Sequence, residues 1–279
     1  MRLLMFHTQG DIYVGIRTDN GVIRTSIKAS YFFKEGWRAY EQLRQTTLDI
    51  SVYAQEEDLE LAPAVPDPGK IICVGLNYRK HAAESGMDEP EYPLLFSKFN
   101  NTIAGDGDEI PMSDDWNQVD YESELVVVIG KEAKNVSVEN ALDYVLGYCN
   151  GNDISERALQ FRSGQWLLGK TPDKFLPIGP YLVTADTITD PQNLVIRGWF
   201  NGELRQESNT SDMIFSVAEI IAYASEYMTL YPGDIISTGT PEGVILGYPE
   251  DERQWMKPGD EYTVEIEGLG KLTNKMTKA

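Results

Sequence analysis

Short apolar-rich segments bounded by turn residues open the chain. RLLMFHT (residues 2–8), DIYVGIRT (11–18) and GVIRTSI (21–27) are separated by Gln9-Gly10 and by Asp19-Asn20-Gly21. Segments of this length and composition, punctuated by Gly and Asn, predict three β-strands in a meander. A helix is predicted next, around residues 37–44.

From residue 70 onward, further strands are predicted with few helices between them. They lie in KIICVGL (70–76), ELVVVIG (124–130), YLVTAD (181–186), NLVIRGWFNG (193–202), DIISTG (234–239) and YTVEIEGLGKLTN (262–274). This pattern predicts a β-rich α+β fold rather than a doubly wound sheet. The proline-rich stretch LAPAVPDPGK (61–70) predicts a linker between a small N-terminal α+β domain, residues 1–66, and a larger domain, residues 67–279.

Composition and charge narrow the classes of function. The chain has 279 residues, of which 42% are hydrophobic and 24% charged, as in ordinary soluble globular proteins. Its 44 acidic and 24 basic residues give a formal charge of −20, which argues against nucleic acid or an anionic membrane as partner. No apolar run is long enough for a secretion signal or a membrane span, so we expect a cytoplasmic protein.

Carboxylates cluster in VDYESELVVVIG. A strand has a side-chain period of two, so Asp120, Glu122 and Glu124 are predicted on one face of it. Adjacent carboxylates are either a solvated edge or the ligands of a hard cation such as Mg²⁺ or Mn²⁺.

A further carboxylate, Asp153, lies in GNDISERALQF. The residue is either the cap of a following helix or another ligand of the same cation. If the helix begins at Asp153, then Arg157 and Gln160 lie on the same face of it, at i+4 and i+7.

A possible base lies in GLNYRKHAAESGMDEPEYP. A short helix is predicted there, capped by Asn77 and ended at Gly86. His81 and Glu84 stand side by side on it at i and i+3, either as an exposed surface pair or as a base oriented by a carboxylate. Separately, YPGDIISTGTPEGV predicts a strand that ends in a loop at Thr240, which is either a plain turn or a site for a carboxylate.

The segment GQWLLGKT (164–171) satisfies the written pattern of a phosphate-binding P-loop. Bulky residues occupy the loop positions whose backbone N–H groups must approach the phosphate closely. Pro172 and Pro177 prevent a long helix from following. A nucleotide site is therefore disfavoured, and Lys170 needs another role.

Five of these motifs, in this order, resemble the fumarylacetoacetate hydrolase family. They are GLNYRKHAAE, the D-Y-E-S-E strand, the N-D-x-x-x-R-x-x-Q segment, GKTPDKFLPIGP and GDIISTGTPEGV, within a likeness that runs from about Lys70 to Leu272. The resemblance implies a mixed β-sandwich roll, a bound Mg²⁺ or Mn²⁺, a small keto-acid substrate and a homodimer.

The same resemblance implies roles for individual residues. The metal ligands would be Glu122, Glu124 and Asp153, and the pair that activates water would be His81 and Glu84. Arg157 and Gln160 would position substrate or water, Thr240 would contact a carboxylate, and Lys170 would face the oxyanion of a keto acid.

The activity expected from this resemblance is hydrolysis of a carbon–carbon bond in an acylpyruvate such as fumarylpyruvate, as in the catabolism of aromatic compounds. Two alternatives share the same enolate chemistry: oxaloacetate decarboxylation, and isomerisation of 2-hydroxyhepta-2,4-diene-1,7-dioate or 5-carboxymethyl-2-hydroxymuconate. A different class of function is a non-catalytic scaffold that binds metal. The paired His81 and Glu84 argue against it, since a scaffold has no use for a base beside a metal.

Overall fold

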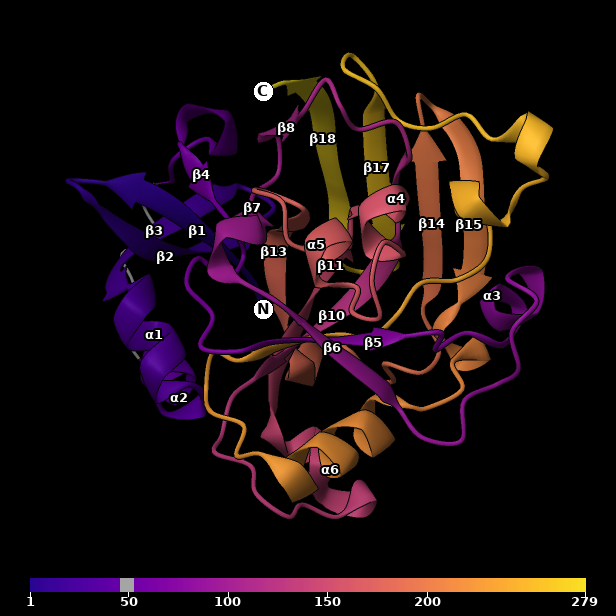
Figure 1. The fold of residues 1–279 in the computed structure, drawn as a ribbon. Helices are drawn as coiled ribbons and strands as arrows, with labels where there is room; N and C mark the ends of the chain where they lie inside the picture. Colours follow the sequence, from indigo (N-terminus) through magenta and orange to yellow (C-terminus); the bar gives the residue numbers. More distant parts are fainter. Residues whose placement is uncertain (46–52) are drawn as a thin grey trace.

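Two sheets form the framework of the molecule, and the computed structural model describes residues 1–45 and 53–279 (Figure 1). The strands of the large sheet are, in spatial order, β3 (Gly21–Lys28), β2 (Asp11–Thr18), β1 (Arg2–Thr8), β13 (Leu176–Thr184), β11 (Val145–Asn152), β10 (Ser123–Ile129), β16 (Ile235–Ser237), β5 (Ile71–Gly75) and β6 (Leu94–Lys98). Two short strands join it at the side, β4 (Leu61–Ala62) beside β1 and β7 (Ile103–Ala104) beside β13.

The second sheet is smaller and contains the C-terminus. Its strands are, in spatial order, β15 (Glu203–Asn209), β14 (Val195–Phe200), β17 (Glu261–Ile266), β18 (Gly270–Lys278) and β8 (Glu109–Met112). A separate two-stranded ribbon pairs β9 (Val119–Asp120) with β12 (Ser155–Glu156). The mixed, sheet-rich α+β class predicted from the sequence is confirmed.

The helices are short. They are α1 (Ala29–Glu35), α2 (Trp37–Gln45), α3 (Arg79–Glu84), α4 (Arg157–Gln160), α5 (Leu167–Lys170) and α6 (Val217–Tyr227), with 3₁₀ turns η1 (Glu56–Asp58), η2 (Asn100–Thr102), η3 (Val138–Tyr144), η4 (Ala185–Thr187), η5 (Thr210–Asp212), η6 (Ile245–Gly247) and η7 (Glu250–Glu252). Among the described residues, no helix is long and apolar enough to cross a membrane.

Strand β10 is buried on both faces, which explains its continuous apolar sequence. Leu125, Val127 and Ile129 point into a core shared with β14, β17 and β18 of the smaller sheet. Val126 and Val128 point the other way, into a core shared with the N-terminal strands and with α1 and α2. The period of two along β10 therefore joins two apolar layers through one central strand.

The N-terminal segment continues the large sheet. Strand β1 pairs antiparallel with β13, with Leu3 opposite Leu182. The proline-rich stretch also packs inward, because Ala64 and Val65 are fully buried. The predicted division between residues 66 and 67 stays a prediction, but the sheet and one apolar core run across it.

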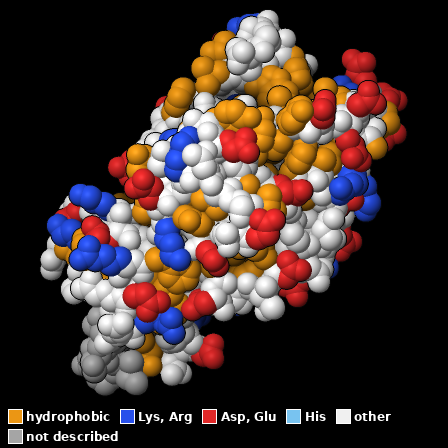
Figure 2. Space-filling model, turned by 90° about the horizontal axis from the view of Figure 1, so that it is seen from below, with side chains coloured by type: hydrophobic (Ala, Val, Ile, Leu, Met, Phe, Trp, Pro, Cys, Tyr) orange, Lys and Arg blue, Asp and Glu red, His pale blue; other side chains and the backbone are white. Residues whose placement is uncertain are grey.

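The surface matches the acidic composition. Figure 2 shows acidic side chains spread over the face seen from below, interspersed with apolar ones and with small groups of Lys and Arg. This face displays no extended basic patch of the kind that binds a phosphate backbone.

Gly36 joins the two N-terminal helices to the central sheet. It lies between α1 and α2 with a φ of +54°, and a Cβ on it would lie 2.1 Å from the Gly130 carbonyl oxygen. The next residue, Trp37, donates its backbone N–H to that carbonyl at 2.9 Å. A side chain at position 36 would therefore push the helices away from the sheet.

We expect Gly36→Ala to lower the free energy of unfolding by at least about 2 kcal/mol, because the left-handed backbone and the clash both act against it. Chemical denaturation of the whole chain measures this loss. The matched control is Gly164→Ala, where an added Cβ meets nothing within 4 Å, and we expect a change within about 0.5 kcal/mol. Equal stability of the two variants would show that the helices tolerate displacement from the sheet.

Candidate metal and active site

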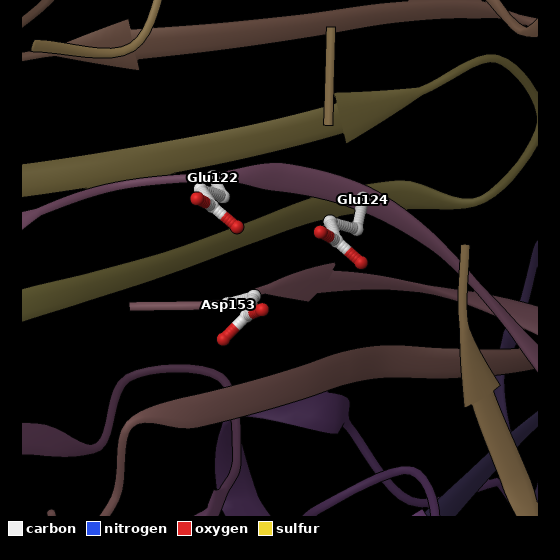
Figure 3. Close-up of side chains that lie close together, drawn as sticks. All are labelled: Glu122, Glu124 and Asp153. Carbon is white, nitrogen blue, oxygen red and sulfur yellow. The ribbon is translucent and has the colours of Figure 1, made fainter. Parts of the chain in front are cut away.

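Three buried carboxylates converge where β10 begins and β11 ends (Figure 3). Glu122, Glu124 and Asp153 each offer an oxygen, and these oxygens all lie within 4.8 Å of one another. The register explains the convergence: Ser123 of β10 faces Asn152 of β11, so Asp153 emerges beside Glu122. The Asp153 N–H donates to the Glu122 carbonyl at 3.0 Å and fixes this juxtaposition.

The helix predicted to start at Asp153 starts later. Residues 155 and 156 form the ribbon strand β12, and α4 begins at Arg157 with Glu156 as its cap, whose carboxylate accepts from the Leu159 N–H at 2.6 Å. Asp153 therefore belongs to the end of a strand, and the expected common helical face with Arg157 and Gln160 is wrong. The pairing of β12 with β9 outweighs the helical pattern.

Three cations are buried against these acids. Lys170 at the end of α5 lies 2.8 Å from both Glu122 and Asp153. Arg157 forms ion pairs with Glu122 at 2.7 Å and with Asp120 at 2.8 Å. Charged groups are rarely buried unless they are paired in this way.

Lys98 at the end of β6 is the third cation, and sequence reasoning missed it. It pairs with Asp153 and donates to the Ile154 carbonyl at 3.0 Å. Its surroundings in LLFSKFN give no pattern from which its role could be recognised. The described cluster thus contains four buried carboxylates and three buried cations: Asp120, Glu122, Glu124 and Asp153, with Lys98, Arg157 and Lys170. If all seven groups are ionised, one negative charge is in excess.

Glu124 is the carboxylate of this cluster that no cation contacts among the described residues. Its oxygen accepts from the Ser237 hydroxyl and from the Gly239 N–H at 3.0 Å, both of which are neutral donors. Burial, together with the negative charges of Asp153 and Glu122, raises the pKa of Glu124 to about 8. Burial also acts to raise the pKa of Glu122, but Lys170 and Arg157 outweigh it and hold that pKa well below its usual range.

This donor set fits a divalent cation. Mg²⁺ and Mn²⁺ prefer carboxylate oxygens, and Glu124 has no cation in direct contact among the residues described. Lys170 already bridges Glu122 and Asp153, so an ion would share those two carboxylates with its ammonium group.

The helix α3 brings the predicted base to the same place. His81 Nδ1 lies 2.8 Å from a Glu84 carboxylate oxygen, and His81 is buried. The other Glu84 oxygen accepts from the Gly243 N–H at 3.0 Å. Gly247 is required beside it, since a Cβ there would lie 2.6 Å from the Glu84 carboxylate carbon.

Asn77 has a different role from the predicted helix cap. Tyr78 stands at the cap position of α3, where no side chain makes a capping hydrogen bond. The Asn77 amide instead donates to the carbonyls of Phe215 and Thr238, at 3.0 and 2.8 Å. It thereby ties the start of α3 to the loop that follows β16.

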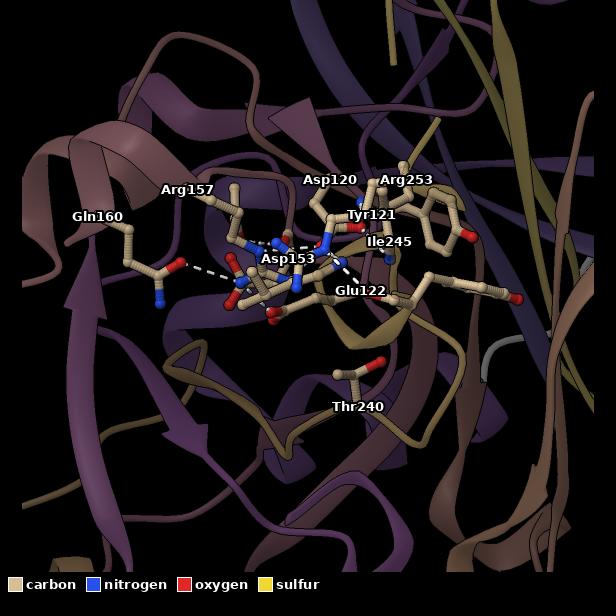
Figure 4. A network of polar contacts seen from close by, with 12 residues as sticks. Asp120, Tyr121, Glu122, Asp153, Arg157, Gln160, Thr240, Ile245 and Arg253 are labelled. Carbon is tan, nitrogen blue, oxygen red and sulfur yellow. Dashed lines mark hydrogen bonds and ion pairs between the residues drawn. The ribbon is translucent and has the colours of Figure 1, made fainter. Parts of the chain in front are cut away.

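Asp120, the last residue of β9, holds the loop of residues 243–247 (Figure 4). Its carboxylate accepts from the N–H groups of Ile245 and Leu246, at 2.8 and 3.0 Å, and from Arg157 Nε at 2.9 Å. The loop that holds Glu84 is thus fixed to the end of β9, two residues before Glu122. The single strand predicted through Asp120, Glu122 and Glu124 is interrupted at residues 121–122, between β9 and β10, and nothing in the sequence revealed this structural role of Asp120.

A cavity of about 420 Å³ connects these groups. Every predicted site residue except Glu124 and Asp153 lines it: His81, Glu84, Glu122, Arg157, Gln160, Lys170 and Thr240. Aromatic and aliphatic side chains supply much of the remaining wall, including Phe96, Phe161, Trp166 and Leu246, and Arg253 completes it. The cavity brings the predicted residues together, and their individual roles stay predictions.

Comparison with known proteins identifies similar chains. Residues 70–277 match the family described as fumarylacetoacetate (FAA) hydrolase, C-terminal. A rat protein named oxaloacetate tautomerase Fahd2a, mitochondrial, is 48% identical over 241 residues, which cover 83% of this chain and 76% of the relative. A human protein named oxaloacetate tautomerase FAHD2A, mitochondrial, is 39% identical over 291 residues, covering 99% of this chain and 91% of the relative.

Among solved structures, maleylpyruvate hydrolase from Sphingobium sp. SYK-6, in complex with manganese(II) ion and pyruvate, superposes with a TM-score of 0.80. It is 28% identical and the match covers 100% of both chains. The names of the rat and human relatives place those proteins in mitochondria, which contradicts the cytoplasmic location expected from the sequence.

The pKa of Glu124 predicts how the metal-free protein responds to pH. Folding raises this pKa from 4.5 to about 8, so the folded state holds the proton more tightly than the unfolded state. The stabilisation is complete below pH 4.5 and is lost as pH rises through about 8. We therefore expect wild-type protein in chelator to lose Tm, relative to Glu124→Gln, across that range.

Thermal unfolding as a function of pH checks this prediction, with the exposed strand residue Glu109 changed to Gln as control. Added Mn²⁺ should raise the Tm of wild type and of Glu109→Gln but not that of Glu124→Gln, because a bound ion stabilises only the state that binds it. Parallel pH profiles for wild type and Glu124→Gln would mean that Glu124 is ionised in the metal-free site.

Proposed function

The chain belongs to the fumarylacetoacetate hydrolase family, and from that premise we propose that it is a divalent-metal-dependent enzyme that interconverts the keto and enol forms of oxaloacetate. One observation carries the proposal: a histidine held by a carboxylate shares a cavity with a buried lysine and a cluster of carboxylates. Keto–enol exchange needs a base for a proton on carbon and positive charge beside the developing oxyanion.

The choice of oxaloacetate is supported by the relatives. Both the rat and the human protein bear the name oxaloacetate tautomerase, and the human match extends over 99% of this chain. They favour oxaloacetate, the substrate of one alternative, over the acylpyruvate hydrolysis that the sequence motifs first predict. The reaction in their names is tautomerisation, whereas the alternative expected from the sequence is decarboxylation.

Glu122, Glu124 and Asp153 would hold the metal, which we propose to be Mg²⁺ or Mn²⁺. When bound, such an ion polarises the 2-keto group and the carboxylate next to it. The related hydrolase that contains manganese(II) and pyruvate supports a site where a cation and the pyruvyl end of a keto acid meet.

His81 is the proposed base. Its Nδ1 faces Glu84 at 2.8 Å, which leaves Nε2 to take a proton from C3, the carbon between the keto group and the distal carboxylate. Glu84 orients the ring and stabilises the imidazolium that forms. The electron pair of the broken C3–H bond becomes the C2–C3 double bond, and the π pair of the 2-keto group moves onto the 2-oxygen.

Lys170 is proposed to stabilise the negative charge on that oxygen. Its ammonium is buried between Glu122 and Asp153, and although burial opposes its charge, these two carboxylates raise its pKa above the usual value. It therefore stays protonated throughout the physiological range. A proton from solvent adds to the 2-oxygen and completes the enol, while the His81 imidazolium releases to solvent the proton that it took from C3. The reverse steps return a proton to C3.

Carbon–carbon hydrolysis of an acylpyruvate is the second candidate, favoured by the similarity to maleylpyruvate hydrolase. It uses the same residues but needs a water that attacks the distal carbonyl, whereas tautomerisation needs no nucleophile. The homodimer implied by the family resemblance, and the absence of nucleic acid and membrane from its partners, stay predictions.

We expect the Mn²⁺-loaded protein to accelerate ketonisation of enol-oxaloacetate, and His81→Gln to lower kcat by roughly 10²–10⁴-fold. The ultraviolet absorbance of the enol follows the reaction directly. The matched control is His7→Gln, which changes the second of the two histidines, an exposed residue of β1, and should leave kcat unchanged.

Two results would contradict the proposal. The first is wild-type turnover that persists in rigorously metal-free protein. The second is acylpyruvate cleavage with a kcat/KM far above that for oxaloacetate tautomerisation, which would make hydrolysis the principal activity.

A further inference from the structure

Most charged side chains in the cavity are already engaged with one another. Lys170 is paired with Glu122 and Asp153, and Arg157 with Glu122 and Asp120. Arg253 is different: it lines the same cavity, yet within the described parts of the chain no carboxylate forms an ion pair with it. Of the Lys and Arg side chains that line the cavity in the described structure, it is therefore the one available to an external anion.

Two neighbouring residues hold the Arg253 side chain in place, and neither of them is an acid that would neutralise its positive charge. Its Nε donates to the Tyr248 carbonyl at 2.9 Å, and its guanidinium lies 6.0 Å from the centre of the Trp255 ring. Both contacts come from the loop between η6 and β17, to which Arg253 itself belongs. The neighbouring acids of η7, Glu250, Asp251 and Glu252, are exposed.

A guanidinium fixed through Nε keeps the N–H groups on its two terminal nitrogens for another acceptor. Such groups form charge-assisted hydrogen bonds with carboxylates, frequently two in parallel. Figure 4 draws Arg253 in one cluster with Asp120 and Ile245, whose hydrogen bond fixes the loop of residues 243–247 beside the end of β9. The anchoring of Ile245 by Asp120 therefore also fixes the base of the segment that carries Arg253.

We propose that Arg253 binds the second carboxylate of a dicarboxylic 2-keto acid and so selects this class of substrate. The inference rests on the proposed function for the other end of the molecule, where the keto group and its adjacent carboxylate meet the metal-ligand cluster.

Among the described residues, the rest of the cavity wall offers no equivalent partner. Phe96, Phe161 and Trp166 are aromatic, and Gln160 and Thr240 are neutral. Lys170 and Arg157 could reach a distal carboxylate only by giving up buried ion pairs, which costs several kcal/mol when a charge is left unpaired. A monocarboxylic keto acid would leave Arg253 without a partner, so the second carboxylate decides the preference.

Binding of malate and lactate to Mn²⁺-loaded protein tests the proposal by calorimetry. Both are stable 2-hydroxy acids with the same metal-chelating end, and they differ only in the distal carboxylate. We expect wild type to prefer malate, and Arg253→Met to lose at least about tenfold in malate affinity with lactate unchanged. Arg253→Lys should recover part of the loss, because it restores the charge but not the paired donors.

Lys257→Met is the matched control. It removes one positive charge from an exposed position in the same loop, and we expect the malate preference to stay intact. A thermal scan of each variant confirms that the loop change has not unfolded the chain. Kinetics add a second measure: Arg253→Met should raise KM for oxaloacetate by at least about tenfold while kcat changes little.

The outcomes separate the two proposals. If Arg253→Met retains the malate preference, or weakens malate and lactate equally, the role of Arg253 is wrong whatever the activity. If wild type fails to tautomerise oxaloacetate but its malate preference disappears in Arg253→Met, the proposed function fails and dicarboxylate recognition stands.

Discussion

The site depends on the cost of burying four carboxylates together. An isolated buried carboxylate is expensive, and the repulsion among several increases the expense. Lys98, Arg157 and Lys170 offset most of it, and each comes from a different element, β6, α4 and α5. The short helices are thus fixed to the sheet by charge as much as by apolar packing. Glu124 has no such counter-ion among the described residues, and burial and its acidic neighbours oppose its ionisation.

A second set of contacts links this cluster to the base. Asp120 accepts from Arg157 on one side and from the N–H groups of Ile245 and Leu246 on the other. The same loop presents the Gly243 N–H to Glu84, which in turn holds His81. Movement of the loop would therefore disturb the electrostatic cluster and the orientation of the imidazole together. Rigid support of this kind is what a proton transfer at a fixed carbon requires.

The sequence predicted the parts of the site that depend on local periodicity. Glu122 and Glu124 share a face because strand residues alternate, and His81 and Glu84 meet because helix residues three apart are neighbours. Asp153 was placed on the wrong element, since the pairing of β12 with β9 is a tertiary contact that local pattern does not contain. Lys98 and Asn77 were missed or misassigned for the same reason: their partners lie far away in the chain, at Asp153 and at Phe215 and Thr238. The N-terminal strands were predicted correctly, while their continuity with the central sheet depends on the long-range pairing of β1 with β13.

The distribution of charge is compatible with the proposed anionic substrate, although the protein as a whole is strongly acidic. The formal charge of −20 resides largely on the surface, where interactions beyond about 8–10 Å are screened at physiological salt. Inside the site, a divalent ion would turn the excess of one negative charge into an excess of one positive charge. The carboxylate at the keto end of the proposed substrate would neutralise that excess, so a second carboxylate would find no counter-charge there unless another cation met it. Arg253, held by the Tyr248 carbonyl rather than by an acid, supplies a positive charge that no neighbouring carboxylate has already cancelled. The proposed recognition of a dianion therefore depends on the site and its loop, and is compatible with an acidic surface.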